Sequence, residues 1–120
     1  MVVWFCPDYP ERMILIMVKF PIRPEKTAEW LELADSYTRA VQAEPGNDFF
    51  QISRSLDDEN EYVTIEGFAD AAAGQVHMKQ DHVAHFMGTM PDLVSAQPKI
   101  IYVDADEVTG FVDMGEIRPR

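Results

Sequence analysis

Cysteine is almost absent from this chain of 120 residues, since Cys6 is the only one. A single thiol cannot form a disulfide within the chain, and it cannot build a cysteine-based metal site. Small secreted domains commonly depend on such cross-links, whereas proteins of reducing compartments do not. We therefore expect a cytoplasmic protein.

Cations are also scarce. Ten lysine and arginine residues stand against 21 aspartate and glutamate residues, which gives a net charge of −11 and a pI of about 4.5. Nucleic-acid backbones and anionic membrane surfaces carry negative charge and would repel such a chain. We expect neither nucleic acid nor a membrane as a partner.

Long apolar runs and glycine-rich motifs are missing as well. No stretch approaches the roughly 18 apolar residues of a membrane-spanning helix, and the short apolar run 2–6 follows no basic residue, unlike a secretory signal. The sequence also lacks the glycine fingerprint that cradles phosphates. We therefore expect no nicotinamide, flavin or ATP cofactor.

Apolar residues nevertheless make up 47% of the chain and aromatic residues 11%. This is enough for one hydrophobic core, and the length suits one domain. Pro7 and Pro10 separate the start of the chain from a strongly apolar segment that opens at Met13, and the composition turns acidic after residue 105. We expect an N-terminal extension over 1–12, a domain over 13–105 and a tail over 106–120.

The spacing of apolar residues indicates alternating strands and helices. Residues 13–20 are rich in β-branched side chains and too short for a typical helix, whereas apolar side chains recur every three or four positions in 25–43. A polar connector of hairpin length joins two alternating segments. The patterns predict strands over 13–20, 49–56, 62–68 and 98–105, and helices over 25–43, 71–80 and 81–90. The last of these helices ends before Pro91 and has Val83, Phe86, Met87 and Met90 on its apolar face.

This order of elements, βαββαβ, is that of the ferredoxin-like α+β fold, in which helices cover one face of a four-stranded antiparallel sheet. The first and last strands are apolar on both faces. A sheet with one open face should carry polar residues there, so a second sheet is the simplest cover. We expect a homodimer that packs sheet against sheet, with Phe111 and Val112 of the tail reaching the partner.

All three histidines, His77, His82 and His85, fall within nine positions. Histidine is the side chain best suited to accept and return protons near neutral pH. A metal site is a competing interpretation because His82 and His85 are one helical turn apart, but no second cluster of ligand residues is evident. The histidines thus suit proton transfer or a structural role, and we expect no metal.

Arg54 and Glu66 are charged residues in strands whose neighbours are apolar, and buried charges persist when they are paired or used. Arg54 is a candidate for holding an anionic oxygen while Glu66 orients a histidine; the alternative is a structural ion pair. Five aromatic residues either line a pocket for a flat ligand or form the core: Trp30, Tyr37, Phe50, Phe68 and Phe86.

Several short motifs, in this order, resemble the antibiotic biosynthesis monooxygenase family over about 13–105: Glu44-Pro45-Gly46-Asn47, Arg54-Ser55 before Asp57-Asp58, Glu66-Gly67-Phe68, and His77 followed by His82 and Phe86. The resemblance implies a dimeric α/β barrel of ferredoxin-like subunits. It also implies an oxygenase that works without metal, flavin or haem on quinols or phenolic aromatics.

Oxygen in its triplet ground state reacts slowly with closed-shell molecules, but a deprotonated hydroquinone is electron-rich enough to give it one electron. The protein would therefore control deprotonation. This predicts His77 or His82 as the base, Arg54 as the holder of the anion, Glu66 as the orienting group, and Phe68 and Phe86 as walls. A non-catalytic ligand-binding module of the same fold, and an isomerase or lyase acting on a small metabolite, remain the alternatives.

Overall fold

The computed structural model describes residues 13–106 and 110–120. A short 3₁₀ turn, Pro24–Lys26, precedes the first helix. The elements are β1 (Met13–Pro21), α1 (Thr27–Gln42), β2 (Asn47–Arg54), β3 (Glu61–Phe68), α2 (Ala71–Met78), α3 (Asp81–Leu93) and β4 (Lys99–Ala105). This confirms the expected α+β ferredoxin-like class. The expected extension over 1–12 lies outside the described residues.

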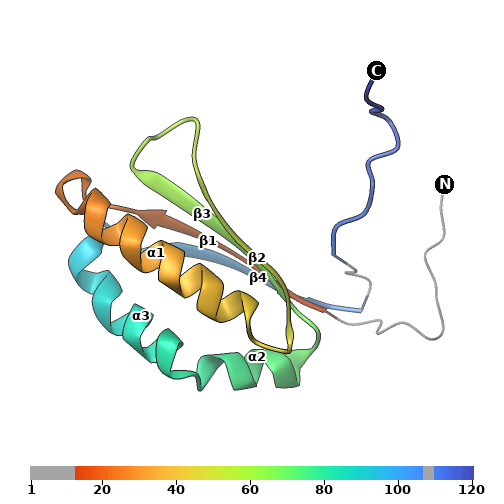
Figure 1. The fold of residues 1–120 in the computed structure, drawn as a ribbon, viewed down its shortest axis with the longest axis horizontal. Coiled ribbons are helices and arrows are strands. Elements are labelled where there is room, and N and C mark those ends of the chain that lie inside the picture. The colour runs from red at the N-terminus through yellow and green to blue at the C-terminus, as the bar shows by residue number, and fades with distance from the viewer. Residues whose placement is uncertain (1–12, 107–109) are drawn as a thin grey trace.

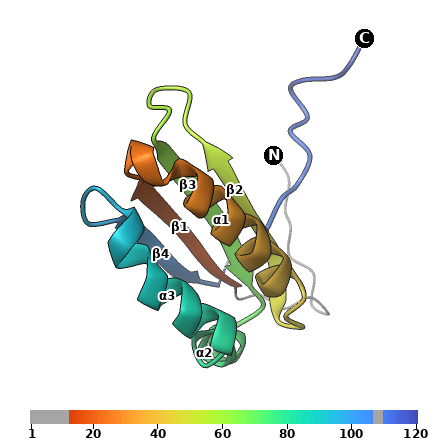
Figure 2. The ribbon, with the colours of Figure 1, turned by 60° about the vertical axis from the view of Figure 1, so that its left-hand side comes forward.

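The four strands form one antiparallel sheet in the order β2-β3-β1-β4. All three helices lie on the same face of this sheet (Figures 1 and 2). Strand alternation explains the core between them, because even-numbered residues of β1 and β3 point toward the helices. The largest fully buried side chains of this core are Trp30, Phe50, Phe68, Ile14, Ile22 and Leu93.

Helix α3 corrects two expectations. It runs through Pro91 to Leu93, because a proline near the end of a helix removes a single hydrogen bond and the Val94 N–H closes the last turn on the Met90 carbonyl at 3.1 Å. Met87 is also 54% exposed, whereas Phe86 and Met90 are buried. The apolar face of α3 is therefore narrower than its sequence indicates.

The opposite face of the sheet carries no helix in the described part of the chain (Figure 2). Its apolar residues include Leu15 and Met17, and β4 is exposed on both faces, with Ile100 at 63% and Ile101 at 57%. Both faces of the edge strand are thus apolar and accessible to water in the single chain.

The tail begins on this uncovered face. The Phe111 ring lies 4.9 Å from the Phe49 ring of β2, and Phe49 in turn covers Gly67, where a Cβ would lie 2.6 Å from the Phe49 ring. Phe111 and Val112 remain largely exposed. Among the described residues, no helix is long and apolar enough to cross a membrane.

Candidate active site

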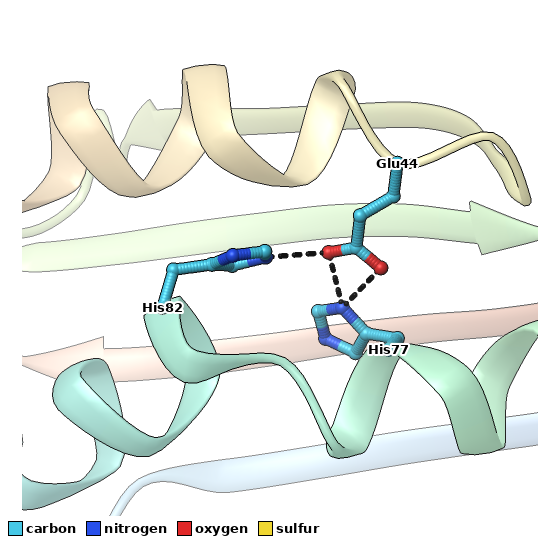
Figure 3. A group of neighbouring side chains, drawn as sticks. All are labelled: Glu44, His77 and His82. Atoms are coloured by element: carbon cyan, nitrogen blue, oxygen red, sulfur yellow. Dashed lines mark hydrogen bonds and ion pairs between the residues drawn. The ribbon is translucent and has the colours of Figure 1, made fainter.

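Three side chains from three different segments meet under the helices: Glu44, His77 and His82 (Figure 3). The His77 Nδ1 atom lies 2.8 and 3.1 Å from the two carboxylate oxygens of Glu44. The His82 Nε2 atom lies 2.7 Å from Glu44 Oε2. One carboxylate therefore joins both rings, and we call these three residues the Glu44 cluster.

The local sequence explains how the cluster forms. Helix α1 ends at Gln42 with Ala43 as its C-cap, and the chain turns at Pro45 because proline disfavours helical geometry in the residue before it. Asp70 caps α2 by accepting a hydrogen bond from the Ala73 N–H at 2.8 Å. His77 then falls in the last turn of α2 and His82 in the first turn of α3. Both rings point toward the Glu44 carboxylate.

Hydrogen bonding to a carboxylate fixes the protonation pattern of the two rings. An ionised carboxylate accepts hydrogen bonds only, so His77 Nδ1 and His82 Nε2 each carry the hydrogen that they donate to Glu44. In the neutral rings, His77 Nε2 and His82 Nδ1 are then the atoms that can accept a proton.

Glu66 adds a second carboxylate on the sheet side. Its side chain points from β3 toward the helices, is buried, and places Oε1 3.9 Å from His77 Nε2. Burial raises the pKa of Glu66 from 4.5 to about 7; the Thr64 hydroxyl opposes this rise, and the charge of Glu44 adds to it. Two buried carboxylates thus flank His77, one on each ring nitrogen.

Aromatic rings enclose the cluster on the core side. The Phe68 ring lies 4.6 Å from the His77 ring, and the Tyr37 ring lies 6.0 Å from the His82 ring while stacking on Phe86 at 4.0 Å. Burial, with the charges of Glu66 and Glu44, raises the pKa of Tyr37. Its hydroxyl therefore keeps its proton at neutral pH.

A cavity of about 440 Å³ opens to solvent beside the cluster. Its polar lining consists of Glu44, Gln80 and His82, and the rest is small or apolar: Ala40, Ala43, Pro45, Gly46, Ala73 and Val76. The cluster is therefore not sealed. A molecule in the cavity can reach Glu44 and His82, whereas His77 lies behind them with 4% exposure.

The structure brings together His77, His82 and Glu66 among the residues proposed from sequence, and it separates Arg54 from them. Arg54 is exposed at the end of β2 and pairs with Tyr62, whereas Glu66 pairs with Phe50. Tyr62 and Glu66 are four positions apart on β3, which is about 13 Å along the strand.

The five aromatic residues proposed as pocket walls are all buried in the hydrophobic core, and none of them lines the cavity beside the cluster. These residues are Trp30, Tyr37, Phe50, Phe68 and Phe86. His85, the histidine left out of the proposed site, is exposed on α3.

Glu44 is the site residue that sequence reasoning missed. In the sequence, Glu44-Pro45-Gly46-Asn47 is one of the motifs of the family resemblance, and in the structure it forms the turn between α1 and β2. A signal was available, because a carboxylate just after a helix C-terminus faces the negative end of the helix dipole and is unfavourable there without compensation. Two histidines provide that compensation here.

Comparisons with known proteins agree with this architecture. The profile of the antibiotic biosynthesis monooxygenase family matches residues 13–89. The Bacillus subtilis (strain 168) protein "Putative monooxygenase YcnE" is 28% identical over 95 residues, which cover 79% of this chain and all of that protein.

Solved structures give the same result. A putative antibiotic biosynthesis monooxygenase from Caulobacter crescentus superposes with a TM-score of 0.75 at 26% identity, covering 84% of this chain and 94% of that one. A putative antibiotic biosynthesis monooxygenase from Nitrosomonas europaea gives a TM-score of 0.74 at 23% identity, covering 82% and 94%. The chain belongs to the antibiotic biosynthesis monooxygenase family.

Proposed function

We propose that this protein is a cofactor-independent monooxygenase that oxidises a quinol or phenolic aromatic substrate with O₂ after removing a proton from it. One observation carries the proposal: a buried carboxylate makes hydrogen bonds to two histidines beside an open, mostly apolar cavity. Family membership supports an oxygenase reaction, and the geometry supports proton abstraction as the step under protein control.

His82 is the base in this proposal, because it lines the cavity and His77 does not. Glu44 holds the His82 ring through Nε2 and leaves Nδ1 to take the proton from the substrate hydroxyl. The charge that develops on His82 is stabilised by the same carboxylate. Gln80 lines the cavity, and its amide Nε2 donates one hydrogen to the Val76 carbonyl at 3.2 Å, which leaves a second hydrogen for the substrate anion, the role predicted for Arg54.

Electron transfer then follows from the substrate itself. The quinol anion gives one electron to O₂, and the resulting radical and superoxide combine to form a carbon–oxygen bond. The protonated His82 returns its proton to the peroxide. The O–O bond then breaks as the ring carbon loses its hydrogen, so that one oxygen atom stays as a ring hydroxyl or carbonyl and the other leaves as water. The quinol supplies all four electrons that reduce O₂, so the reaction needs no external reductant.

Oxygen consumption tests the proposal. Purified protein should accelerate O₂ uptake with at least one member of a panel of benzo-, naphtho- and anthrahydroquinones, and ¹⁸O₂ should label the organic product with one atom. His82→Asn should lower the rate by about a hundredfold or more, because a positioned base contributes roughly that much. Glu44→Gln should do the same by releasing both rings.

His85→Asn is the matched control, since His85 lies on the same helix and is exposed. It should keep the full rate. An uptake rate equal to that of the buffer across the whole panel would refute the proposed function, and so would an equal loss in His85→Asn and His82→Asn.

We further propose that two copies associate through the uncovered sheet faces. Ile65 and Met17, which pair across β3 and β1, lie at the middle of that face. Analytical ultracentrifugation should give about twice the chain mass of 13.7 kDa, and Ile65→Lys should give the monomer. Leu31→Lys, on the exposed side of α1, should leave the dimer intact. A stable wild-type monomer at micromolar concentration would contradict this arrangement.

A further inference from the structure

We propose that the Glu44 cluster binds a divalent transition-metal ion, with Zn²⁺ as the probe, in competition with the hydrogen bonds that hold the cluster together. Each of the three residues offers one ligand atom, and these atoms all lie within 4.8 Å of one another. Binding is independent of the proposed function. Its consequence for activity rests on that function, because the ion would occupy the proposed base.

To hold an ion, the ligand atoms must change their separations by about 1 Å. Zinc binds histidine nitrogen and carboxylate oxygen at about 2.0 to 2.2 Å, so tetrahedral ligand atoms lie about 3.4 Å apart. The nitrogen–oxygen distances of 2.7 and 2.8 Å would lengthen by about 0.6 to 0.7 Å, and the widest separation, which is within 4.8 Å, would shorten by up to about 1.4 Å. The ligands come from the turn after α1, the last turn of α2 and the first turn of α3.

The donor set suits a transition metal rather than calcium or magnesium. Two imidazoles and one carboxylate are typical ligands of zinc and of iron(II), while calcium and magnesium prefer oxygen alone. Three protein ligands leave a fourth position, and two of the three ligands, Glu44 and His82, line the cavity of about 440 Å³. Water or a small ligand can enter from there, as in open metal sites.

The surroundings also fit a cation. When His77 binds through Nδ1, its hydrogen moves to Nε2, which faces Glu66 Oε1 at 3.9 Å. A carboxylate that accepts a hydrogen bond from the outer nitrogen of a ligating histidine is the usual support of a zinc ligand. The net charge of −11 favours cation approach in general.

Metal binding would prevent His82 from acting as the base. His82 would bind through Nε2 and its hydrogen would move to Nδ1, which would then have no lone pair left to take the proton of the substrate. The same three residues would thus either transfer protons or bind a metal ion. We infer that divalent transition metals inhibit the enzyme by occupying the site.

A direct binding experiment tests the site without any substrate. The full chain, stripped with a chelator and then desalted, is titrated with Zn²⁺ against a chromogenic chelator, and with Co²⁺ while the visible absorption is followed. The wild type and the His85→Asn control should bind one ion per chain. Glu44→Gln and His82→Asn should bind at least about tenfold more weakly, with circular dichroism confirming that they fold.

His82→Cys separates this inference from the proposed function. A thiolate is a good zinc ligand, so this variant should keep Zn²⁺ binding while losing oxygenase activity. Loss of binding in His85→Asn, unchanged binding in Glu44→Gln and His82→Asn, or no saturable binding by the wild type would each overturn the metal site. Each of these results would leave the oxygen-consumption test unaffected.

Discussion

Replacing Glu66 by glutamine should stabilise the protein at alkaline pH and change little near pH 4.5. Burial raises the pKa of Glu66 from 4.5 to about 7, against the opposing effect of the Thr64 hydroxyl and with a contribution from the charge of Glu44. The folded state therefore favours the neutral carboxyl group. Glutamine is close to this neutral form in shape and stays uncharged at every pH.

The sign of the pH dependence follows from linkage. Between pH 4.5 and about 7 the folded protein holds a proton on Glu66 that the unfolded chain has released. The stability that this proton provides is fully present below pH 4.5 and is lost as the pH rises through about 7. At about 1.4 kcal/mol per pH unit, the difference between 4.5 and about 7 corresponds to roughly 3 kcal/mol. This is a large share of the 5 to 15 kcal/mol that typically stabilises a domain.

Urea unfolding at a series of pH values between 4.5 and 8.5 measures this effect. The free energy of unfolding of Glu66→Gln should match that of the wild type at the acidic end and exceed it by roughly 3 kcal/mol at the alkaline end. Glu59→Gln, at an exposed position in the β2–β3 connection, is the control and should follow the wild type throughout. A difference between Glu66→Gln and wild type that does not vary with pH would refute the reasoning.

Three substitutions around α2 test how the helix is placed. Gly46→Ala should cost about 1 to 3 kcal/mol by overpacking, because its Cβ would lie 2.5 Å from the Ala73 Cβ; wild-type stability in urea unfolding would contradict this. Gly74 lies in α2 with open space around it. Gly74→Ala should therefore stabilise the protein by up to about 1 kcal/mol through helix propensity, and a lower melting temperature would argue against this. Asp70→Ala should cost about 1 kcal/mol through loss of the hydrogen bond to the Ala73 N–H, and an unchanged melting temperature would show that the cap contributes nothing.

Much of the fold could be predicted because its signals are local. The strand over 13–20 and the helix over 25–43 differ little from β1 at Met13–Pro21 and α1 at Thr27–Gln42. Their β-branched residues and their three-to-four spacing belong to one element each. One exception is Pro91, since the cost of a proline depends on how many helical residues follow it, which a local sequence pattern does not reveal.

The site was harder because its members are distant in sequence. His77 and His82 were candidates because histidine is the residue that titrates near neutrality. Glu44 lies 33 and 38 residues before them, and only the packing of α2 and α3 beside the end of α1 shows that it joins both rings. Arg54 and Glu66 were grouped because both are charged residues in strands, but pairing register, not residue type, decides which strand positions meet.

Helix α2 has one further property with consequences for its dynamics. Among its eight residues, the only buried one is His77. A helix without buried leucine or isoleucine side chains gains little from apolar area, so it should open locally at lower free energy than α1 or the central strands. Opening would break the His77 contact with Glu44 and expose the cluster to solvent. Backbone amides of α2 should accordingly exchange their hydrogens early, and the rate of that exchange would report how often the interior of the site becomes accessible.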